Sequence, residues 1–272
     1  MAQRFCMTLT STGFRWLVLL TLLGTLPIDG FGQRQRLLDH NAIGWYVYNG
    51  DHKLTQRWTL HTEYQWRRID LIRSWQQSLA RLGVNYKSSD RVKLGAGYTY
   101  FTTFPYGGYP QADLGVPYSE HRLHQDVSLS ETYGRLSLTH RIRLEQRWLA
   151  QLADDNPRRT ASWEFQNRVR YQIAGELALN GPTVDDGELY INFFDELFIG
   201  FGKNVGENIY NQNRISAGLG YQVNDGLQIE LNALNQVVQH ADLDPVSGRP
   251  VFEVNNGFRL TINHALDFRK KR

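Results

Sequence analysis

Cysteine is almost absent from this chain of 272 residues, and its one copy is Cys6. Cys6 precedes the apolar run near the start of the chain, whereas the cysteine that anchors a lipoprotein would follow such a run. A mature chain without this segment would hold no cysteine, so it could form neither a disulfide nor a thiolate metal site. This excludes a small secreted domain that depends on disulfides.

Long apolar runs are also scarce. The clearest one spans residues 16–26, after Arg4 and Arg15 and before Pro27. This layout is typical of a cleaved secretory signal, and the run is too short to cross a bilayer as a helix. We therefore expect residues 1–32 to be a signal peptide and residues 33–272 to form one mature domain, with a retained membrane anchor as the alternative.

A strong excess of charge of one sign is lacking as well. The net charge is +3, and the basic run 269–272 is larger than that, so nothing else supports nucleic-acid binding. The mean hydropathy of −0.47 is too low for a bundle of membrane helices, yet the chain has 7 Trp and 14 Tyr. A transmembrane barrel combines these properties, because half of each strand faces a polar interior and aromatic rings lie at both membrane interfaces.

Alternation of apolar and polar residues is what the chain has in abundance. It is clearest in two arms, residues 135–148 and 163–173. In the first arm, one face holds Leu136, Leu138, Ile142, Leu144 and Trp148, and the other holds Ser137, Thr139, Arg141, Arg143, Glu145 and Arg147. Side chains alternate across a strand with period two, so both arms are predicted to be amphipathic strands, longer than the usual ~5–6 residues.

The same alternation recurs along the rest of the chain, with no helical period and no linker. Further strands are predicted near residues 41–49, 55–66, 74–87, 91–102, 121–133, 188–200, 208–223, 227–238 and 254–268. Short turns alternate with longer loops near residues 67–73, 103–120, 149–161, 201–208 and 240–252. This asymmetry and an aromatic residue at the end of the last strand, Phe268, are typical of outer-membrane barrels. The predicted fold is all-β, a single antiparallel up-and-down transmembrane β-barrel of about ten strands, within a range of ten to twelve.

Two alternatives stay open at this point. Ten strands account for residues 55–268, and the segment 41–49 would be a partial strand, a segment bound in the lumen or part of a larger barrel. A soluble β-sandwich or lipocalin-like barrel has the same periodicity, with its Arg/Glu faces outside and its aromatic faces buried. Strand length, aromatic strand ends and loop asymmetry favour the membrane barrel.

Several short motifs together resemble a known family. They are Phe194-Asp-Glu-Leu-Phe198, Gln212-Asn-Arg214 with Gly218-Leu-Gly-Tyr221, Leu144-Glu-Gln-Arg-Trp148 followed by Arg168-Val-Arg-Tyr171, and Trp45-Tyr46 leading to Trp58 and Glu63. Their order and spacing resemble the uncharacterised bacterial outer-membrane β-barrel family filed as domain of unknown function two-four-nine-zero, over nearly all of the mature chain. The resemblance implies a barrel in the outer membrane of a Gram-negative bacterium. It implies no established activity, so no catalytic residue is carried over.

In a membrane barrel the charged faces of the strands point into the lumen. The predicted lumen set is Arg57, Glu63, Arg141, Arg143, Glu145, Arg147, Glu164, Arg168, Arg170, Glu196, Arg214, Glu230 and Arg259. A small barrel has room for little more than its own side chains, and buried charges must be paired. We expect Arg–Glu bridges that fill the lumen, with a narrow anion-leaning pore or binding cavity as the alternative, because arginine outnumbers glutamate in this set.

His124, Asp126 and Ser128 are of the residue types that a Ser/His/Asp hydrolase uses, and they alternate on one face of one predicted strand. Residues two apart on a strand are separated by ~6.5–7 Å, whereas a nucleophile and its base need contact of ~3 Å. We therefore expect no catalytic residues. The histidines show no H-x-x-x-H or H-E-x-x-H pattern, so we expect neither a metal nor a cofactor.

The sequence thus predicts a non-enzymatic outer-membrane barrel, structural or weakly permeable. Its expected partners are outer-membrane lipid and, during insertion, the barrel-assembly machinery, with no nucleic acid. An outer-membrane lipid hydrolase is one rival hypothesis. The other is a barrel that binds a small solute or surface ligand, with the loops 103–120 and 240–252 as contact surface. The aromatic-rich stretch 104–110 is expected to fold over the barrel mouth rather than to bind a partner.

Overall fold

The structure is a computed structural model, and it describes residues 35–112, 114–205 and 209–269. The predicted signal peptide lies outside the described residues. From Arg36 onward the chain forms one compact all-β unit. Within the described ranges, no helix is long and apolar enough to cross a membrane.

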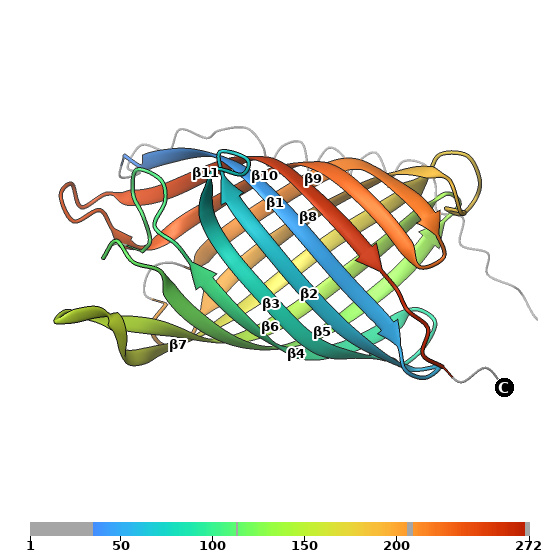
Figure 1. The fold of residues 1–272 in the computed structure, drawn as a ribbon, viewed down its shortest axis with the longest axis horizontal. Coiled ribbons are helices and arrows are strands. Elements are labelled where there is room, and N and C mark those ends of the chain that lie inside the picture. The colour runs from blue at the N-terminus through green and yellow to red at the C-terminus, as the bar shows by residue number, and fades with distance from the viewer. Residues whose placement is uncertain (1–34, 113, 206–208, 270–272) are drawn as a thin grey trace, which may run out of the picture. The chain divides into compact units, whose positions relative to one another are not determined.

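Eleven strands follow one another and close into a single barrel (Figure 1). They are β1 (Leu37–Lys53), β2 (Trp58–Ile69), β3 (Ser74–Lys87), β4 (Val92–Thr103), β5 (Tyr118–Tyr133), β6 (Leu136–Ala153), β7 (Asn156–Ala178), β8 (Leu189–Phe201), β9 (Tyr210–Asn224), β10 (Leu227–Leu243) and β11 (Pro250–His264). Each strand pairs in antiparallel fashion with the next, as the short connections require. The predicted all-β barrel of ten to twelve strands is confirmed.

The segment 41–49 belongs to a full strand of the barrel wall. β1 pairs antiparallel with β2, from Ile43 opposite Ile69 to Lys53 opposite Thr59. It pairs in parallel with β11 over a longer register. An odd number of strands in a meander makes the first and last run in the same direction, so their pairing must be parallel. The alternatives of a partial strand or a lumen-bound segment are therefore wrong, and the larger barrel is right.

The parallel seam between β1 and β11 depends on one close backbone approach. A Cβ atom at Gly257 would lie 1.7 Å from the carbonyl oxygen of Ile43. Real Cβ atoms do not come so close to backbone atoms, so this position accepts only glycine without a shift of β1.

The connections differ between the two ends of the barrel. The C-terminal end, which we define by the last residue of β11, holds the connections 54–57, 88–91, 134–135, 179–188 and 225–226. The opposite end, called the loop end, holds the connections 70–73, 104–117, 154–155, 202–209 and 244–249. The long loop predicted near 149–161 is a two-residue turn instead, because β6 and β7 continue as a long hairpin at the loop end (Figure 1).

The polar faces of the strands point inward and the apolar faces point outward. Arg143 and Glu145 of β6 are 5% and 1% exposed, whereas their neighbour Ile142 is 58% exposed. The Arg/Glu faces therefore do not lie outside, as the soluble alternative would have required. The middle of β1 departs from the rule: Ile43, Trp45 and Val47 point inward and form a small core cluster with Leu234.

Candidate functional site

Three large aromatic side chains inside the barrel are buried against arginines, on three different strands. Trp45, Phe101 and Phe198 come from β1, β4 and β8. The guanidinium of Arg67 lies 3.8 Å from the centre of the Trp45 ring, and that of Arg122 lies 3.9 Å from the centre of the Phe101 ring. These distances are well within the ~6 Å over which a cation and a ring face attract each other.

Further arginines link these rings across the interior. The guanidinium of Arg214 lies 5.0 Å from the Trp45 ring and 4.7 Å from the Phe198 ring. Arg170 lies 4.4 Å from the Phe198 ring. The arginine–aromatic layer, as we name it, consists of Trp45, Arg67, Phe101, Arg122, Arg168, Arg170, Phe198 and Arg214. It takes residues from seven strands spaced around the wall, so it crosses the interior.

Carboxylates bind most of these arginines. Arg170 bridges two of them, with nitrogens 2.7 Å from Glu145 and 2.6 Å from Glu196. Arg168 lies 2.6 Å from Glu145, and Arg141 lies 2.9 Å from Glu196. Charge-assisted bonds of this kind are what a buried charge needs to offset its desolvation.

A second group of ion pairs lies on β5 and β6. Arg122 and Arg147 both bind Glu120, at 2.6 and 2.5 Å. Arg143 binds Asp126 at 2.6 Å. These ion pairs therefore join residues of neighbouring strands as well as residues of one strand.

Positive charge is in excess in this central region. Its nine arginines are Arg67, Arg81, Arg122, Arg141, Arg143, Arg147, Arg168, Arg170 and Arg214, and the five carboxylates that pair with them are Glu63, Glu120, Asp126, Glu145 and Glu196. The arginine excess expected from the sequence is thus present in this central region, and it makes the region attractive to anions.

Four residues of the predicted lumen set lie outside these contacts. Arg57 is exposed in the connection before β2, where it donates to the Tyr86 hydroxyl at 3.1 Å. Its predicted place in the lumen is wrong, because the strand begins one residue later. Glu164 is half-buried and accepts a hydrogen bond from Gln166 at 2.7 Å. Glu230 accepts one from Tyr190 at 3.0 Å, and Arg259 lies 5.5 Å from the centre of the Phe194 ring.

Sequence reasoning missed four interior residues, Arg67, Arg81, Glu120 and Arg122. Glu120 and Arg122 share the face of His124, so extending the period-two pattern of β5 backwards would have found both. Arg67 lies beyond the predicted end of its strand, which continues to Ile69. Arg81 lies on a strand whose alternation is weaker, and its partner Glu63 comes from the neighbouring strand.

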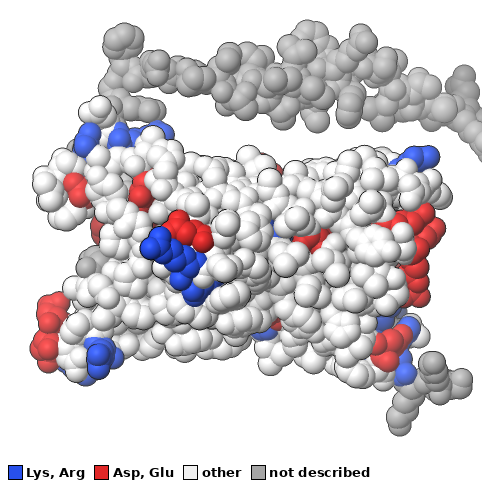
Figure 2. All heavy atoms as spheres, turned by 45° about the horizontal axis from the view of Figure 1, so that its top comes forward, with Lys and Arg blue, Asp and Glu red and all other residues white. Residues whose placement is uncertain are grey.

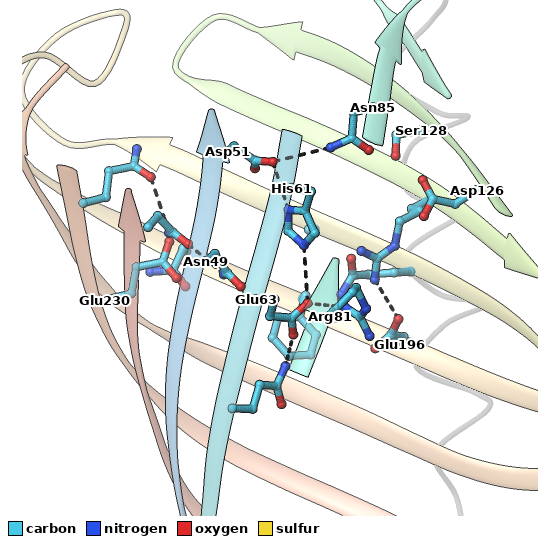
Figure 3. Close-up of a pocket in the computed structure, with 18 of the residues that line it drawn as sticks. Asn49, Asp51, His61, Glu63, Arg81, Asn85, Asp126, Ser128, Glu196 and Glu230 are labelled. Carbon is cyan, nitrogen blue, oxygen red and sulfur yellow. Dashed lines mark hydrogen bonds and ion pairs between the residues drawn. The ribbon is translucent and has the colours of Figure 1, made fainter. Parts of the chain in front are cut away.

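A cavity of about 550 Å³ lies on the side of the layer that faces the C-terminal end. Its walls include Asp225 and Gly226 of the β9–β10 turn, and Ala265, which follows β11, so it reaches that end of the barrel. Glu196 and Arg214 lie at its inner wall. Figure 3 shows polar side chains pointing into it from several strands. The volume lies in the range of small-molecule sites, ~300–1,000 Å³.

His124, Asp126 and Ser128 all line this cavity and are buried. The carboxylate of Asp126 is held by Arg143, with contacts of 2.9 Å to Nε and 2.6 Å to Nη2. His124 Nε2 lies 3.9 Å from Asp126 Oδ2, which is too far for a hydrogen bond. The base and its orienting carboxylate are therefore not joined as a hydrolytic triad requires.

A chain of polar contacts runs inward from Asp51 along the opposite wall (Figure 3). His61 Nδ1 lies 2.9 Å from Asp51 Oδ1, and its Nε2 lies 3.5 Å from Glu63 Oε2. Glu63 also accepts hydrogen bonds from Arg81 and Gln65. The described residues contain no cluster of three His, Cys, Asp or Glu side chains that could hold a metal ion.

At the loop end, the connection 104–117 closes over the mouth of the barrel. Tyr106 donates to Glu253 of β11 at 2.7 Å, and the backbone N–H of Gly108 donates to Asp39 of β1 at 3.0 Å. Burial and the nearby Glu253 carboxylate raise the pKa of the Tyr106 phenol well above its ordinary value, so it stays a donor. A cavity of about 50 Å³ lies between this loop and the arginine–aromatic layer.

Comparison with known proteins agrees with the motifs. Residues 43–246 match the family described as protein of unknown function (DUF2490). The match runs from β1 through β10 and includes the strands that build the arginine–aromatic layer. No curated protein matches the chain significantly. Because the match covers more than half of the sequence, the chain belongs to the DUF2490 family of proteins of unknown function.

Proposed function

We propose that this protein spans the outer membrane of a Gram-negative bacterium as a closed, non-conducting barrel without enzymatic activity. Its outer surface supports a membrane location. Leu82, Ile142 and Leu231 on three strands are 57%, 58% and 58% exposed. Soluble proteins rarely expose contiguous apolar patches above a few hundred Å², so a wall that places large apolar side chains outward on most strands fits lipid.

The distribution of charge and of aromatic rings supports the same location. Figure 2 shows mostly uncharged residues over the middle of one face, with charged residues mainly toward both ends apart from one mixed cluster. Outward rings pair near both ends: Trp58 with Tyr86 at 4.9 Å near the C-terminal end, and Trp75 with Phe104 at 5.1 Å near the loop end. Such aromatic belts lie at the headgroup level of transmembrane barrels.

The single observation that supports a closed interior is the arginine–aromatic layer. Rings from β1, β4 and β8 meet arginines from β2, β5, β7 and β9 across the whole width of the barrel. At the loop end, the loop 104–117 adds a second cover over the interior. An ion that crosses would have to break several buried ion pairs, which is costly. The narrow anion-leaning pore is therefore the second candidate, and the arginine excess is what favours it.

Conductance in a planar bilayer tests this proposal. We expect the refolded mature protein to insert and to show no stable conductance. The double variant Trp45→Ala/Phe198→Ala should conduct, because it removes two of the three rings that close the layer. Trp58→Ala, which truncates an outward ring that is 46% exposed, is the matched control and should stay silent.

Two results would overturn the proposal. Steady anion-favouring conductance of the unaltered protein would make it a narrow pore instead. A protein that stays soluble and folded without lipid or detergent would contradict the membrane location itself.

A further inference from the structure

Three arginine N–H groups in the wall of the larger cavity lack a hydrogen-bond acceptor among the described residues. They are Arg141 Nε, Arg143 Nη1 and Arg214 Nε, and each is shielded from bulk solvent. All three arginines line the cavity at the C-terminal end. A buried charged donor without an acceptor is destabilising, so an anion that reached these guanidinium groups from the cavity would stabilise them.

These donors belong to one cluster rather than to three separate places. Arg141 and Arg214 approach the same carboxylate, Glu196, at 2.9 and 4.0 Å. Arg143 follows Arg141 on the same face of β6, about 6.5–7 Å further along the strand. Its side chain is held from the other side by Asp126 at 2.6 Å. The three guanidinium groups thus lie close to carboxylates, and each has one buried nitrogen that lacks an acceptor.

The charge around this cluster is not balanced. One connected set of ion pairs and the neighbouring pair Arg143–Asp126 together contain the arginines Arg141, Arg143, Arg168, Arg170 and Arg214, and the carboxylates Asp126, Glu145 and Glu196. Five positive and three negative groups leave an excess of two positive charges in a region shielded from solvent. Uncompensated buried charge is unfavourable, and a bound anion would remove it.

We propose that the cavity is a binding site for a small solute with a phosphate or similar oxyanion group, which accepts hydrogen bonds from Arg141, Arg143 and Arg214. Arginine matches phosphate and carboxylate oxygens with two parallel donors, and an excess of two charges suits a dianion best. The rest of the cavity carries more acidic than basic side chains, which disfavours a second anionic group there: Asp51, Glu176, Asp225 and Glu230 against Lys93 and Arg259. The solute would therefore carry one anionic head and an uncharged polar body, within about 550 Å³.

Calorimetric titration of the refolded, detergent-solubilised protein with inorganic phosphate tests the site. We expect saturable binding, and a loss of affinity of about tenfold or more in Arg141→Gln, because one charge-assisted contact is removed. Arg141 is the variant of choice since its side chain is 23% exposed and is the least buried of the three. Arg57→Gln, which lies outside the cavity, should bind like the unaltered protein.

Four outcomes decide the proposal. No saturable phosphate binding by the folded protein overturns it, and so does equal affinity of Arg141→Gln and Arg57→Gln. Tighter binding of glycerol phosphate than of inorganic phosphate supports a solute with an organic body, and equal binding supports the free ion. The test requires only a folded barrel, so its result is independent of the conductance experiment.

Discussion

At the scale of single residues, Glu196 is the carboxylate on which the interior depends most. It lies 2.6 Å from Arg170 and 2.9 Å from Arg141, and Arg214 approaches it at 4.0 Å. Glu196 is 2% exposed, so water could not solvate these arginines in its place. Its loss would leave several arginines facing one another in a shielded interior, where the repulsion between like charges is screened least.

The variant Glu196→Ala should therefore destabilise the barrel by about 3–5 kcal/mol, the usual cost of removing one partner of a buried ion pair. Urea unfolding followed by tryptophan fluorescence in detergent micelles measures this free energy. Glu164→Ala is the control, because Glu164 is half-buried and accepts one hydrogen bond from Gln166, and it should cost less than about 1 kcal/mol. Equal losses in the two variants would show that Glu196 holds no network together.

At the scale of strands, the seam between β1 and β11 is the most constrained pairing. Gly257→Ala places a methyl group against the Ile43 carbonyl, 1.7 Å away in the unaltered geometry. We expect a loss of about 3 kcal/mol, at the upper end of overpacking costs, and faster hydrogen exchange confined at first to β1 and β11. Gly108→Ala is the control, because its nearest atom would be Asp39 Oδ1 at 3.5 Å, an ordinary contact. Uniform exchange changes over all strands would contradict a seam-specific effect.

The loop 104–117 contributes a second test at this scale, through pH. Burial and the nearby Glu253 raise the pKa of Tyr106 in the folded protein above the ordinary value of 10.0. A group whose pKa is raised on folding stabilises the protein fully below its unfolded pKa, and this contribution is lost as the pH rises through the folded pKa. The closed loop should therefore hold at neutral pH and open only under strongly alkaline conditions.

Tyrosinate absorbance makes this measurable. The difference between the titration curves of the unaltered protein and Tyr106→Phe isolates one phenol. We expect that phenol to ionise well above pH 10. Ionisation near the ordinary value would mean that the loop does not bury Tyr106 against Glu253.

At the scale of the whole molecule, β1 decides whether the barrel closes. The strands β2 to β11 are ten in number and could in principle pair end to end in antiparallel fashion. They would then lack Ile43 and Trp45, which are 0% and 2% exposed in the core cluster. A barrel without β1 would also leave two strand edges with unpaired backbone groups.

A mature chain that begins after Lys53 should therefore fail to form a stable barrel. Its refolding into detergent can be followed by the gel mobility of unheated samples, with the full mature chain as reference. Recovery of a compact, heat-sensitive band by the shortened chain would instead show that ten strands close on their own, and that β1 only adds to a barrel already formed.

Much of this structure follows from the chain read alone. The period-two pattern is local, because each strand places successive side chains on opposite faces. It therefore predicts ten of the strands, the separation of charged from apolar faces and the arginine excess within the lumen set. The motifs around Phe194–Phe198 and Gly218–Tyr221 likewise indicate the family, which the match over residues 43–246 confirms.

Other features depend on how the strands are staggered around the barrel, and only the tertiary structure decides them. Glu196 meets Arg141 and Arg170 from separate strands, and Trp45 meets Arg214 across the interior; no local pattern encodes such contacts. The inward apolar residues in the middle of β1 and its parallel pairing with β11 arise from closure itself, since an odd meander must join strands that run the same way. The sequence by itself determined which residues share a face of each strand, because that information is local. Closure of the barrel determined which inward side chains contact each other, because the register and stagger of the strands set which of them meet.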